Sequence, residues 1–278
     1  MTVPRKPKRV VSIYDTSADF ALVLGLPLVA LGGGGPAGRD LAEYQRGQGL
    51  DDLPKFSAYP EVEIETLLTF DPDLVLDDFA LDDEQAKKVA AAVPVFAFNE
   101  QPGSTVDWRV LLRQMATVFG AEAAAEAHIA AYDERVATLK ERLRSRWAGA
   151  TFAYVGPYGD GTYYIAQANM TTNQVMHDDL GFAFAKAAPP TVEERQVDVS
   201  MERLDELNDA DLLLRTNPRE DGTGVDEKSI RQFVDSPLWQ RLPAVEKKQS
   251  YLIPGDLFYT SPRTPGANLD WVEKNLIA

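Results

Sequence analysis

The chain has 278 residues, enough for two domains of ordinary size, each with its own hydrophobic core. Hydrophobic residues make up 45% of the sequence and charged residues 26%, values typical of a soluble globular protein. The formal net charge is −15, so the surface repels phosphate backbones and anionic lipid headgroups. We therefore expect no nucleic acid as partner, and neutral or cationic partners are favoured.

Residue types that the chain lacks or hardly uses exclude several kinds of chemistry. There is no Cys, which excludes disulfides, thiolate zinc sites, iron–sulfur clusters and cysteine nucleophiles. The only two histidines are His128 and His177, so a multi-His metal site is not expected. No apolar stretch reaches the roughly 18 residues that a membrane-spanning helix needs.

The first half of the chain alternates between short buried-strand patterns and helical patterns. Strands are expected at Val10–Tyr14, Leu28–Leu31, Leu74–Leu76 and Val95–Phe98, and helices at Ala18–Leu24, Glu63–Leu68, Glu84–Ala92 and Val106–Phe119. Asp15, Thr16 and Ser17 are candidate caps of the first helix, and Leu50–Pro60 is expected to be a loop. The alternation indicates a mostly parallel sheet with helices on its faces.

Residues 121–147 differ in character, because this stretch of 27 residues contains neither Pro nor Gly. Ile129, Tyr132, Val136, Leu139 and Leu143 form a continuous apolar seam at helical spacing. A helix of this length is about 40 Å long at 1.5 Å per residue. Both a long surface helix and a rigid bridge between two domains fit the pattern.

The second half alternates in the same way. Strands are expected at Phe152–Val155, Leu212–Leu214 and Tyr251–Ile253, a hairpin around Gly159–Gly161, and helices near Asn173–Leu180, Met201–Leu207, Ile230–Val234 and Leu269–Ile277. This order predicts a second α/β lobe.

One phrase occurs twice in the chain. Residues 62–76 read VEIETLLTFDPDLVL, and residues 199–214 read VSMERLDELNDADLLL. Each contains a Glu (Glu65, Glu202), a short amphipathic run, an acidic break and a hydrophobic run of strand length. The two Glu residues are 202 − 65 = 137 positions apart, about half the chain. The repeat predicts two lobes of similar build, with a cleft between them.

The first of these phrases resembles a known family signature. Glu65 followed by Asp71-Pro72-Asp73-Leu74-Val75-Leu76 resembles the E-x-I-x-x-L-x-P-D-L-V-I pattern of cluster III substrate-binding proteins. These are extracytoplasmic receptors of ABC importers for ferric siderophores, haem and cobalamin. Further similar segments are Arg9–Ser12, Leu22–Leu26, Val199–Glu202, Ser236–Val245 and Tyr251–Ile253, so the resemblance runs from about residue 9 to residue 278.

The resemblance implies an α/β fold with two Rossmann-like lobes, mostly parallel sheets and one long rigid helix that joins the lobes. The expected boundaries are residues 1–120 for the N-terminal lobe, 121–147 for the bridging helix and 148–278 for the C-terminal lobe. A binding protein of this family is not an enzyme and has no cofactor of its own. Its expected partners are a small iron chelate and the transmembrane subunits of an ABC permease, and we expect a monomer.

The first residues, MTVPRKPKR, lack the apolar core of a signal peptide. A short tether rich in Pro and basic residues fits a chain from which a signal segment has been removed, which predicts a periplasmic protein or a membrane-anchored lipoprotein. A cytosolic location stays open at this point.

Candidate ligand-binding residues follow the expected strands, because ligands of open α/β sheets bind at the carboxyl ends of the strands. This set is aromatic, polar or charged and comprises Tyr14, Asp15, Tyr59, Phe79, Tyr158, Arg215, Asn217, Tyr259 and Arg263. Tyr offers apolar area with one donor, and Arg offers a planar pair of donors, which suits a chelate with apolar arms and anionic oxygens. For each residue alone, a surface or packing role is an equal alternative. No residue is expected to bind the metal directly.

Glu65 and Glu202 are candidates for permease docking. In the resembling family, one exposed Glu on each lobe meets arginines of the permease, and two carboxylates on separate lobes make a two-point docking pattern. The alternative is that each is an ordinary first-turn Glu stabilised by the helix dipole.

The expected ligand is an iron(III)-siderophore, with the hydroxamate type favoured. The acidic total charge favours a neutral or cationic chelate over an anionic one, although Arg215 and Arg263 act locally in the opposite direction. A haem or cobalamin receptor is the alternative within the family.

An alternative from a different class is a nucleotide-dependent α/β enzyme that uses the Gly33–Gly38 loop. Gly33, Gly35 and Gly38 have the spacing of the dinucleotide fingerprint, but Pro36 interrupts it and no strand ending in an acid follows at the required distance. A flexible loop is therefore the favoured interpretation.

Several other polar residues are expected to have no special role. His128 is predicted on a solvated helix face and His177 on the surface, and Asp77 and Asp78 are predicted to be loop acids. Arg142, Arg144 and Arg146 are predicted to form a solvated helix face.

Overall fold

The structure, a computed structural model, describes residues 2–34, 41–59, 61–78, 81, 83–98, 107–157, 161–166, 168–188, 196–217 and 227–277. The chain divides into two compact units. Unit 1 comprises Met1–Gln101, Val106–Tyr132 and Ser261–Arg263, and unit 2 comprises Pro102–Thr105, Asp133–Thr260 and Thr264–Ala278.

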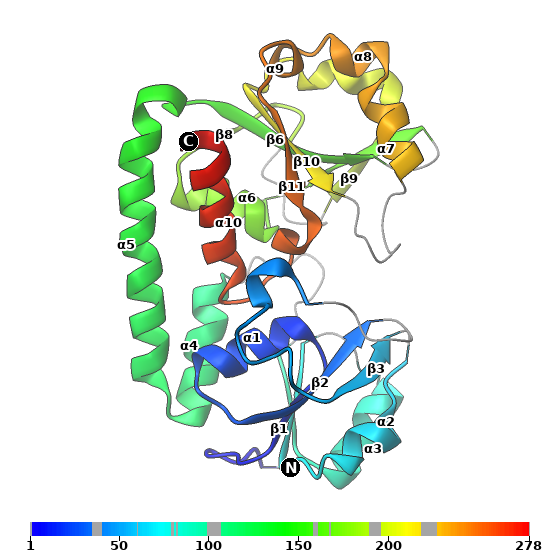
Figure 1. Cartoon of the computed structure of the whole chain (residues 1–278), viewed down its shortest axis with the longest axis vertical. Coiled ribbons are helices and arrows are strands. Elements are labelled where there is room, and N and C mark those ends of the chain that lie inside the picture. Colours follow the sequence, from blue (N-terminus) through cyan, green and yellow to red (C-terminus); the bar gives the residue numbers. More distant parts are fainter. Residues whose placement is uncertain are drawn as a thin grey trace. The chain divides into compact units, whose positions relative to one another are not determined.

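Unit 1 contains a five-stranded sheet of order β3-β2-β1-β4-β5 in which every pair is parallel (Figure 1). The strands are β1 (Val10–Ser12), β2 (Leu28–Gly34), β3 (Lys55–Tyr59), β4 (Leu74–Asp77) and β5 (Val95–Ala97). The central strands β1 and β4 are buried along their whole length. Their continuous apolar runs are what a strand covered on both faces requires.

Helices cover both faces of this sheet. They are α1 (Asp15–Val23), η1 (Glu43–Gln45), α2 (Ile64–Thr69), α3 (Asp83–Ala92) and α4 (Trp108–Phe119). Leu67 of α2 and Val89 of α3 pack with Val11 and Val75 on one face. On the other face, Ala18 of α1 packs with Leu31 and Leu50. The alternation of strand residues between the two clusters follows from the period of two in a strand.

Capping residues determine where two helices of unit 1 begin or end. The side chain of Asp107 accepts a hydrogen bond from the backbone N–H of Arg109, which caps α4, and Gly120 ends that helix with φ of 70°. Helix α1 begins earlier than predicted, because Tyr14 is the N-cap and Asp15 is already helical.

Unit 2 contains a six-stranded mixed sheet. Its main path is β11-β10-β6-β7-β9, and β8 pairs with β6. The strands are β6 (Thr151–Pro157), β7 (Thr162–Ala166), β8 (Ala183–Phe184), β9 (Gln196–Ser200), β10 (Leu212–Asn217) and β11 (Ser250–Pro254). Strands β6, β8, β10 and β11 pair in parallel, whereas β7 pairs antiparallel with both β6 and β9. The predicted hairpin is confirmed by the β6–β7 pair.

The helices that lie wholly within unit 2 are short. They are α6 (Thr171–Gln174), η2 (Val175–Asp179), η3 (Met201–Leu207), α7 (Glu227–Val234), α8 (Pro237–Gln240), α9 (Pro243–Glu246), η4 (Gly255–Phe258), α10 (Thr264–Val272) and η5 (Glu273–Ile277). Phe233 of α7 and Trp239 of α8 are 4.5 Å apart between ring centroids and pack against Leu213 of β10. These aromatic rings form much of the core on that face of the sheet.

Helix α5 (Glu122–Trp147) is continuous, as predicted, and contributes to both units. Its residues up to Tyr132 belong to unit 1, and those from Asp133 belong to unit 2. Within unit 2, the buried indole N–H of Trp147 donates to the carbonyl of Leu276 at 3.1 Å. The predicted seam is buried, and Arg142 and Arg144 are exposed as predicted, in ion pairs with Glu273 and Glu141.

The prediction that Leu50–Pro60 is a loop is wrong, because β3 occupies Lys55–Tyr59. Phe56 and Ala58 point into the core while the strand pairs with β2 at the edge of the sheet. A run this short, flanked by Pro54 and Pro60, carries little pattern of its own. Pairing with β2 decides its conformation.

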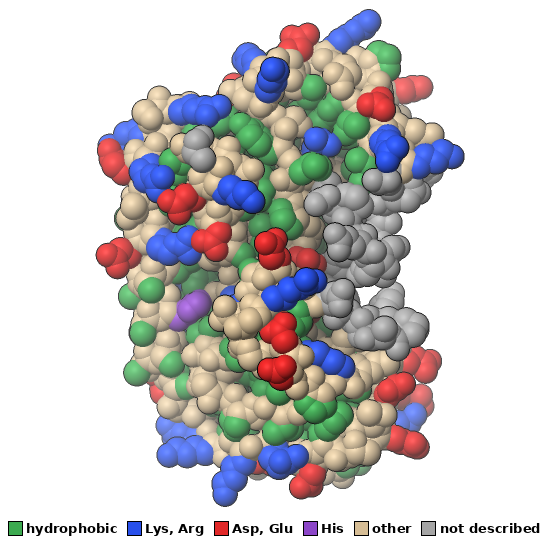
Figure 2. Space-filling view, in the orientation of Figure 1, with side chains coloured by type: hydrophobic (Ala, Val, Ile, Leu, Met, Phe, Trp, Pro, Cys, Tyr) green, Lys and Arg blue, Asp and Glu red, His purple; other side chains and the backbone are tan. Residues whose placement is uncertain are grey.

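The surface seen in Figure 2 intersperses basic and acidic side chains and does not gather either sign into one large patch. Across the described ranges, no helix combines the length and the apolar character needed to cross a membrane.

Gly32→Ala tests how tightly the sheet of unit 1 is packed. A Cβ at Gly32 would lie 2.3 Å from the carbonyl oxygen of Ile13 and 2.9 Å from the Cβ of Ala58. We expect the substitution to lower the free energy of unfolding by about 1 to 3 kcal/mol, because backbone must shift. Urea denaturation measures this.

Gly266→Ala is the matched control, since the nearest atom to an added Cβ there is the Nη1 of Arg135 at 3.9 Å. In helix α10 this change should be neutral or stabilise by up to about 1 kcal/mol. Equal destabilisation by both variants would contradict the packing argument.

Candidate functional site

The carboxyl ends of β1 and β4 lie at the start of α1. Tyr14 and Asp15, two predicted ligand residues, follow β1 directly, with Tyr14 half-buried and Asp15 buried. The turn is tied by Ser17, whose hydroxyl donates to the Tyr14 carbonyl at 3.0 Å and lies 2.7 Å from the Ser12 hydroxyl. These short-range bonds fix the backbone at this edge of the sheet.

Asp78 lies beside this turn at the end of β4. The hydroxyl of Thr16 donates to its Oδ2, whereas its buried Oδ1 has no hydrogen-bond partner among the described residues. Burial raises the pKa of Asp78 to about 7, against the Thr16 hydrogen bond, and the carboxylates of Asp15 and Asp77 add to the rise. Asp77 itself is a buried strand residue. The prediction that Asp77 is a loop acid is therefore wrong, whereas Asp78 lies in the bend after β4 as predicted, with a buried carboxyl oxygen.

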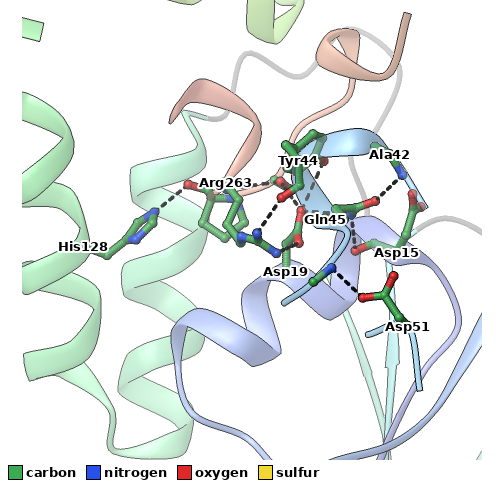
Figure 3. A network of polar contacts seen from close by, with 11 residues as sticks. Asp15, Asp19, Ala42, Tyr44, Gln45, Asp51, His128 and Arg263 are labelled. Atoms are coloured by element: carbon green, nitrogen blue, oxygen red, sulfur yellow. Dashed lines mark hydrogen bonds and ion pairs between the residues drawn. The ribbon is translucent and has the colours of Figure 1, made fainter. Parts of the chain in front are cut away.

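A second buried carboxylate, Asp19, lies one turn further along α1 (Figure 3). Its Oδ1 accepts from Arg263 Nη1 at 3.0 Å. Its Oδ2 accepts from the hydroxyls of Ser261 at 2.8 Å and Tyr44 at 3.2 Å, and from Gln45 Nε2 at 3.2 Å. Burial raises the pKa of Asp19 to about 6, and the attraction of Arg263 opposes this rise.

Arg263, a predicted ligand residue, is the cation of this network. Besides its bond to Asp19, its Nη2 donates to the Tyr44 carbonyl at 2.8 Å, and only 16% of its side chain is exposed. These contacts favour a role in holding chain segments together. Its role in ligand binding stays a prediction.

His128 contacts Pro262, the residue before Arg263. The prediction that His128 lies on a solvated helix face is therefore wrong. Its Nε2 lies 2.6 Å from the carbonyl oxygen of Pro262 (Figure 3). Its ring packs edge-on against Trp108, with the ring centroids 5.7 Å apart. His177 is exposed as predicted and is stacked on Phe184.

In unit 2, Arg215 lies inside a strand and not after one, because β10 continues to Asn217. Its Nε donates to the hydroxyl of Ser250 at 3.0 Å, and its guanidinium lies 5.7 Å from the ring of Trp239. Burial lowers the pKa of Arg215. Such a half-buried cation can attract an anionic group.

The remaining predicted ligand residues are placed as follows. Tyr259 follows η4 and is half-buried, with its ring 5.6 Å from that of Phe258. Tyr59 and Asn217 are the last residues of β3 and β10, but their side chains lie outside the described residues, as do Phe79 and Tyr158 entirely.

Glu65 and Glu202 occupy equivalent positions in the two units. Each is exposed and lies in the first turn of a helix, Glu65 in α2 and Glu202 in η3. Ser200 caps η3 by accepting from the backbone N–H of Glu202 at 3.3 Å. The predicted exposure is confirmed, whereas docking stays a prediction.

The remaining features concern nucleotide and metal binding. Gly33 and Gly34 belong to strand β2, and Gly35 and Gly38 lie outside the described residues. The described ranges contain no group of three or more His, Asp or Glu residues that could hold a metal ion.

Comparison with known proteins decides the family. The model of a family described as "Periplasmic binding protein" matches residues 10–257. The chain belongs to the periplasmic binding protein family. This confirms the resemblance to substrate-binding proteins of ABC importers, a class of extracytoplasmic binding proteins and not of enzymes. The nucleotide-dependent enzyme is therefore set aside.

Individual relatives agree with this assignment. The chain is 22% identical to the iron(3+)-hydroxamate-binding protein FhuD of Bacillus subtilis, covering 99% of this chain and 82% of the relative. The fold is similar to that of the FhuD protein from S. pseudintermedius, with a TM-score of 0.79, 19% identity and coverage of 100% of this chain and 94% of that one. It is also similar to Staphylococcus aureus SirA complexed with staphyloferrin B, with a TM-score of 0.78, 20% identity and coverage of 98% and 93%.

The Asp19 network was not predicted, although one signal for it exists. Asp19 stands between Ala18 and Phe20 in an otherwise apolar stretch of α1, and a lone acid in such a stretch must find partners when it is buried. Nothing in the sequence around Tyr44 or Ser261 identifies these residues as the partners.

Asp78→Asn tests the buried carboxylate. Because the pKa of Asp78 is higher in the folded protein than its ordinary value of 3.8, folding takes up a proton, and this contribution to stability declines as pH rises from about 4 to about 7. Asn has no carboxyl group to titrate, so the stability of the variant should not decline with pH for this reason. Relative to wild type, it should gain roughly 2 to 4 kcal/mol between pH 4 and pH 8.

The measurement is urea denaturation across this pH range. Asp52→Asn, at an exposed position, is the matched control and should show no such gain. A difference between Asp78→Asn and wild type that is the same at pH 5 and pH 8 would contradict the assignment.

Proposed function

We propose that the protein is the extracytoplasmic substrate-binding component of an ABC importer, which binds an iron(III)-siderophore of hydroxamate type and delivers it to the permease. The observation that carries the proposal is the match over 99% of the chain to an iron(3+)-hydroxamate-binding protein. The family match over residues 10–257 supports the transport role. The similarity to a structure complexed with another siderophore supports an iron chelate in general.

The charges at the carboxyl edge of the unit 1 sheet support the hydroxamate type. Asp15 and Asp77 place negative charge near the point where Tyr14 is half-buried, and both raise the pKa of Asp78. A strongly anionic chelate would be repelled by such an edge, whereas a neutral or cationic chelate would not. Tyr14, Asp15 and Arg263 of unit 1, and Arg215 and Tyr259 of unit 2, are the proposed ligand residues whose surroundings are described.

The binding step requires no chemistry on the ligand. The iron is substrate held by the chelate, and the protein recognises the chelate's outer surface through aromatic rings and a few polar groups. That the binding protein is a monomer, and that it is anchored as a lipoprotein, stay predictions that belong to this proposal.

Titration with iron chelates tests the ligand class. A ferric hydroxamate should quench tryptophan fluorescence with a Kd in the micromolar range or below, and should bind more tightly than a ferric tris-catecholate, because of the acidic edge. Ferric citrate, haem and cobalamin serve as comparison ligands. A Soret shift with haem and no response to any siderophore would favour the haem alternative, and no response to any of the chelates would overturn the proposal.

The double variant Glu65→Ala/Glu202→Ala tests permease docking. We expect uptake of the ferric chelate into cells or proteoliposomes to fall at least tenfold, while the Kd for the chelate stays within twofold, because both carboxylates are exposed and lie on helix starts.

Glu61→Ala/Glu246→Ala is the matched control, because it removes two exposed carboxylates elsewhere, and its uptake should remain normal. Weaker ligand binding by the Glu65/Glu202 variant, or equal loss of uptake in both double variants, would sink the docking assignment.

A further inference from the structure

We propose that Asp19 is the positioning residue of the ligand site, and that its carboxylate holds the segment Ser261–Arg263, here called the anchor segment, against the start of α1. The proposal rests on the proposed function for its ligand. It concerns a residue that does not contact the ligand itself, because Asp19 is fully buried.

All three residues of the anchor segment contact other parts of unit 1 (Figure 3). The Ser261 hydroxyl and the Arg263 guanidinium both donate to Asp19, at 2.8 Å and 3.0 Å. The carbonyl oxygen of Pro262 between them lies 2.6 Å from Nε2 of His128. The segment is therefore held from α1 on one side and from α5 on the other.

Four donors converge on the two oxygens of Asp19, three on Oδ2 and one on Oδ1. Bonds to an ionised carboxylate are about twice as strong as neutral ones, and one of these four comes from a guanidinium. Removing the carboxylate would leave the largely buried Arg263 without its counter-ion, which is costly. The carboxylate therefore dominates the energetics of the segment.

The same carboxylate is connected to the residues proposed to bind ligand. Gln45 donates from its Nε2 both to Asp19 and to the carbonyl oxygen of Asp15, at 3.2 Å each. Asp15 lies one helical turn before Asp19, and Tyr259 lies two residues before Ser261. Asp19 thus holds two segments that carry proposed ligand residues and that are far apart in the sequence.

The path of the chain explains why such an anchor is needed. The residues before Ser261 and after Arg263 belong to unit 2, so the chain enters unit 1 for only three residues. A segment this short has no secondary structure of its own to hold it. Its position depends on side-chain contacts, and Asp19 accepts two of the hydrogen bonds that hold it.

The charged and titratable groups that face Asp19 are Arg263 from the anchor segment, Tyr44 from η1 and Asp15 from its own helix; His128 faces Pro262 from α5. The pKa of Asp19, raised to about 6, means that acidification removes the charge that holds Arg263. The anchor segment should therefore loosen below this pH, which gives a second readout.

Hydrogen exchange with mass spectrometry on the full chain without ligand measures the anchor, and titration with a ferric hydroxamate measures the site. In Asp19→Asn and in Arg263→Gln we expect exchange at residues 259–264 and 42–46 to rise at least tenfold, with exchange in β1 and β4 unchanged. The Kd for the chelate should rise about tenfold in both variants. In the Asp19→Asn/Arg263→Gln double variant, the rise in exchange and the rise in Kd should each be smaller than the product of the rises in the two single variants.

Arg135→Gln and Asp270→Asn form the matched control, because they break an exposed ion pair of 2.5 Å elsewhere in the chain and should change neither readout. Arg263→Lys keeps the charge but cannot reach both Asp19 and the Tyr44 carbonyl, so it should restore part of the affinity. If Asp19→Asn does not fold, the two Arg263 variants carry the test.

The pH dependence of exchange is a separate test. Wild-type protein should exchange faster at residues 259–264 at pH 5 than at pH 8, after correction for intrinsic rates, and Asp19→Asn should not.

The outcomes separate the two proposals. Unchanged exchange in Asp19→Asn, or faster exchange with an unchanged Kd, overturns the positioning role while leaving the proposed function intact. A loss of affinity in Arg263→Gln alone would show direct ligand contact by Arg263 and would also overturn it. Failure of the wild-type protein to bind any ferric chelate overturns the proposed function, and the positioning role with it.

Discussion

In each unit, strands that are buried on both faces determine where the polar residues can lie. Strands β1 and β4 of unit 1 are completely covered, and β10 of unit 2 is covered over Leu212–Leu214. A strand that is covered on both faces can carry functional side chains only at its ends, because its interior must satisfy the backbone and pack apolar atoms. Parallel pairing then brings the carboxyl ends of neighbouring strands to the same edge. Tyr14, Asp15 and Asp78 share such an edge for this reason.

Crowding at that edge has an electrostatic consequence. Asp15, Asp19 and Asp78 lie close enough for Asp15 to raise the pKa of both others. The two carboxyls differ in the partners that offset this repulsion. Asp19 is surrounded by donors, including a guanidinium, whereas Asp78 interacts with the hydroxyls of Thr16 and Ser17 and has a pKa close to neutrality. The two carboxyls thus have raised pKa values of different size within one helix turn and strand end, a difference set by their partners and burial.

Much of the fold was predictable because its signals are local. The apolar runs at Val10 and Leu74, the helix breaker Gly120 and the long seam of α5 each predict their own element. The repeated phrase with Glu65 and Glu202 predicted two equivalent helix starts with exposed acids, and both are found. The predictions were wrong where a strand was too short to have a clear pattern, as in β3. They were also wrong where a strand continued past its apolar run, as β10 does at Arg215.

By itself, the sequence determined the class of fold, the order of its elements, the family and the absence of cysteine chemistry, because these depend on composition and on spacing along the chain. Tertiary structure decided the surroundings of the candidate site. His128 became a partner of Pro262 and not a solvated residue, and Arg263 became the counter-ion of Asp19. The physical reason is distance along the chain: Asp19 and Ser261 are 242 positions apart, and a buried charge takes its partners from whichever segments the fold brings to it.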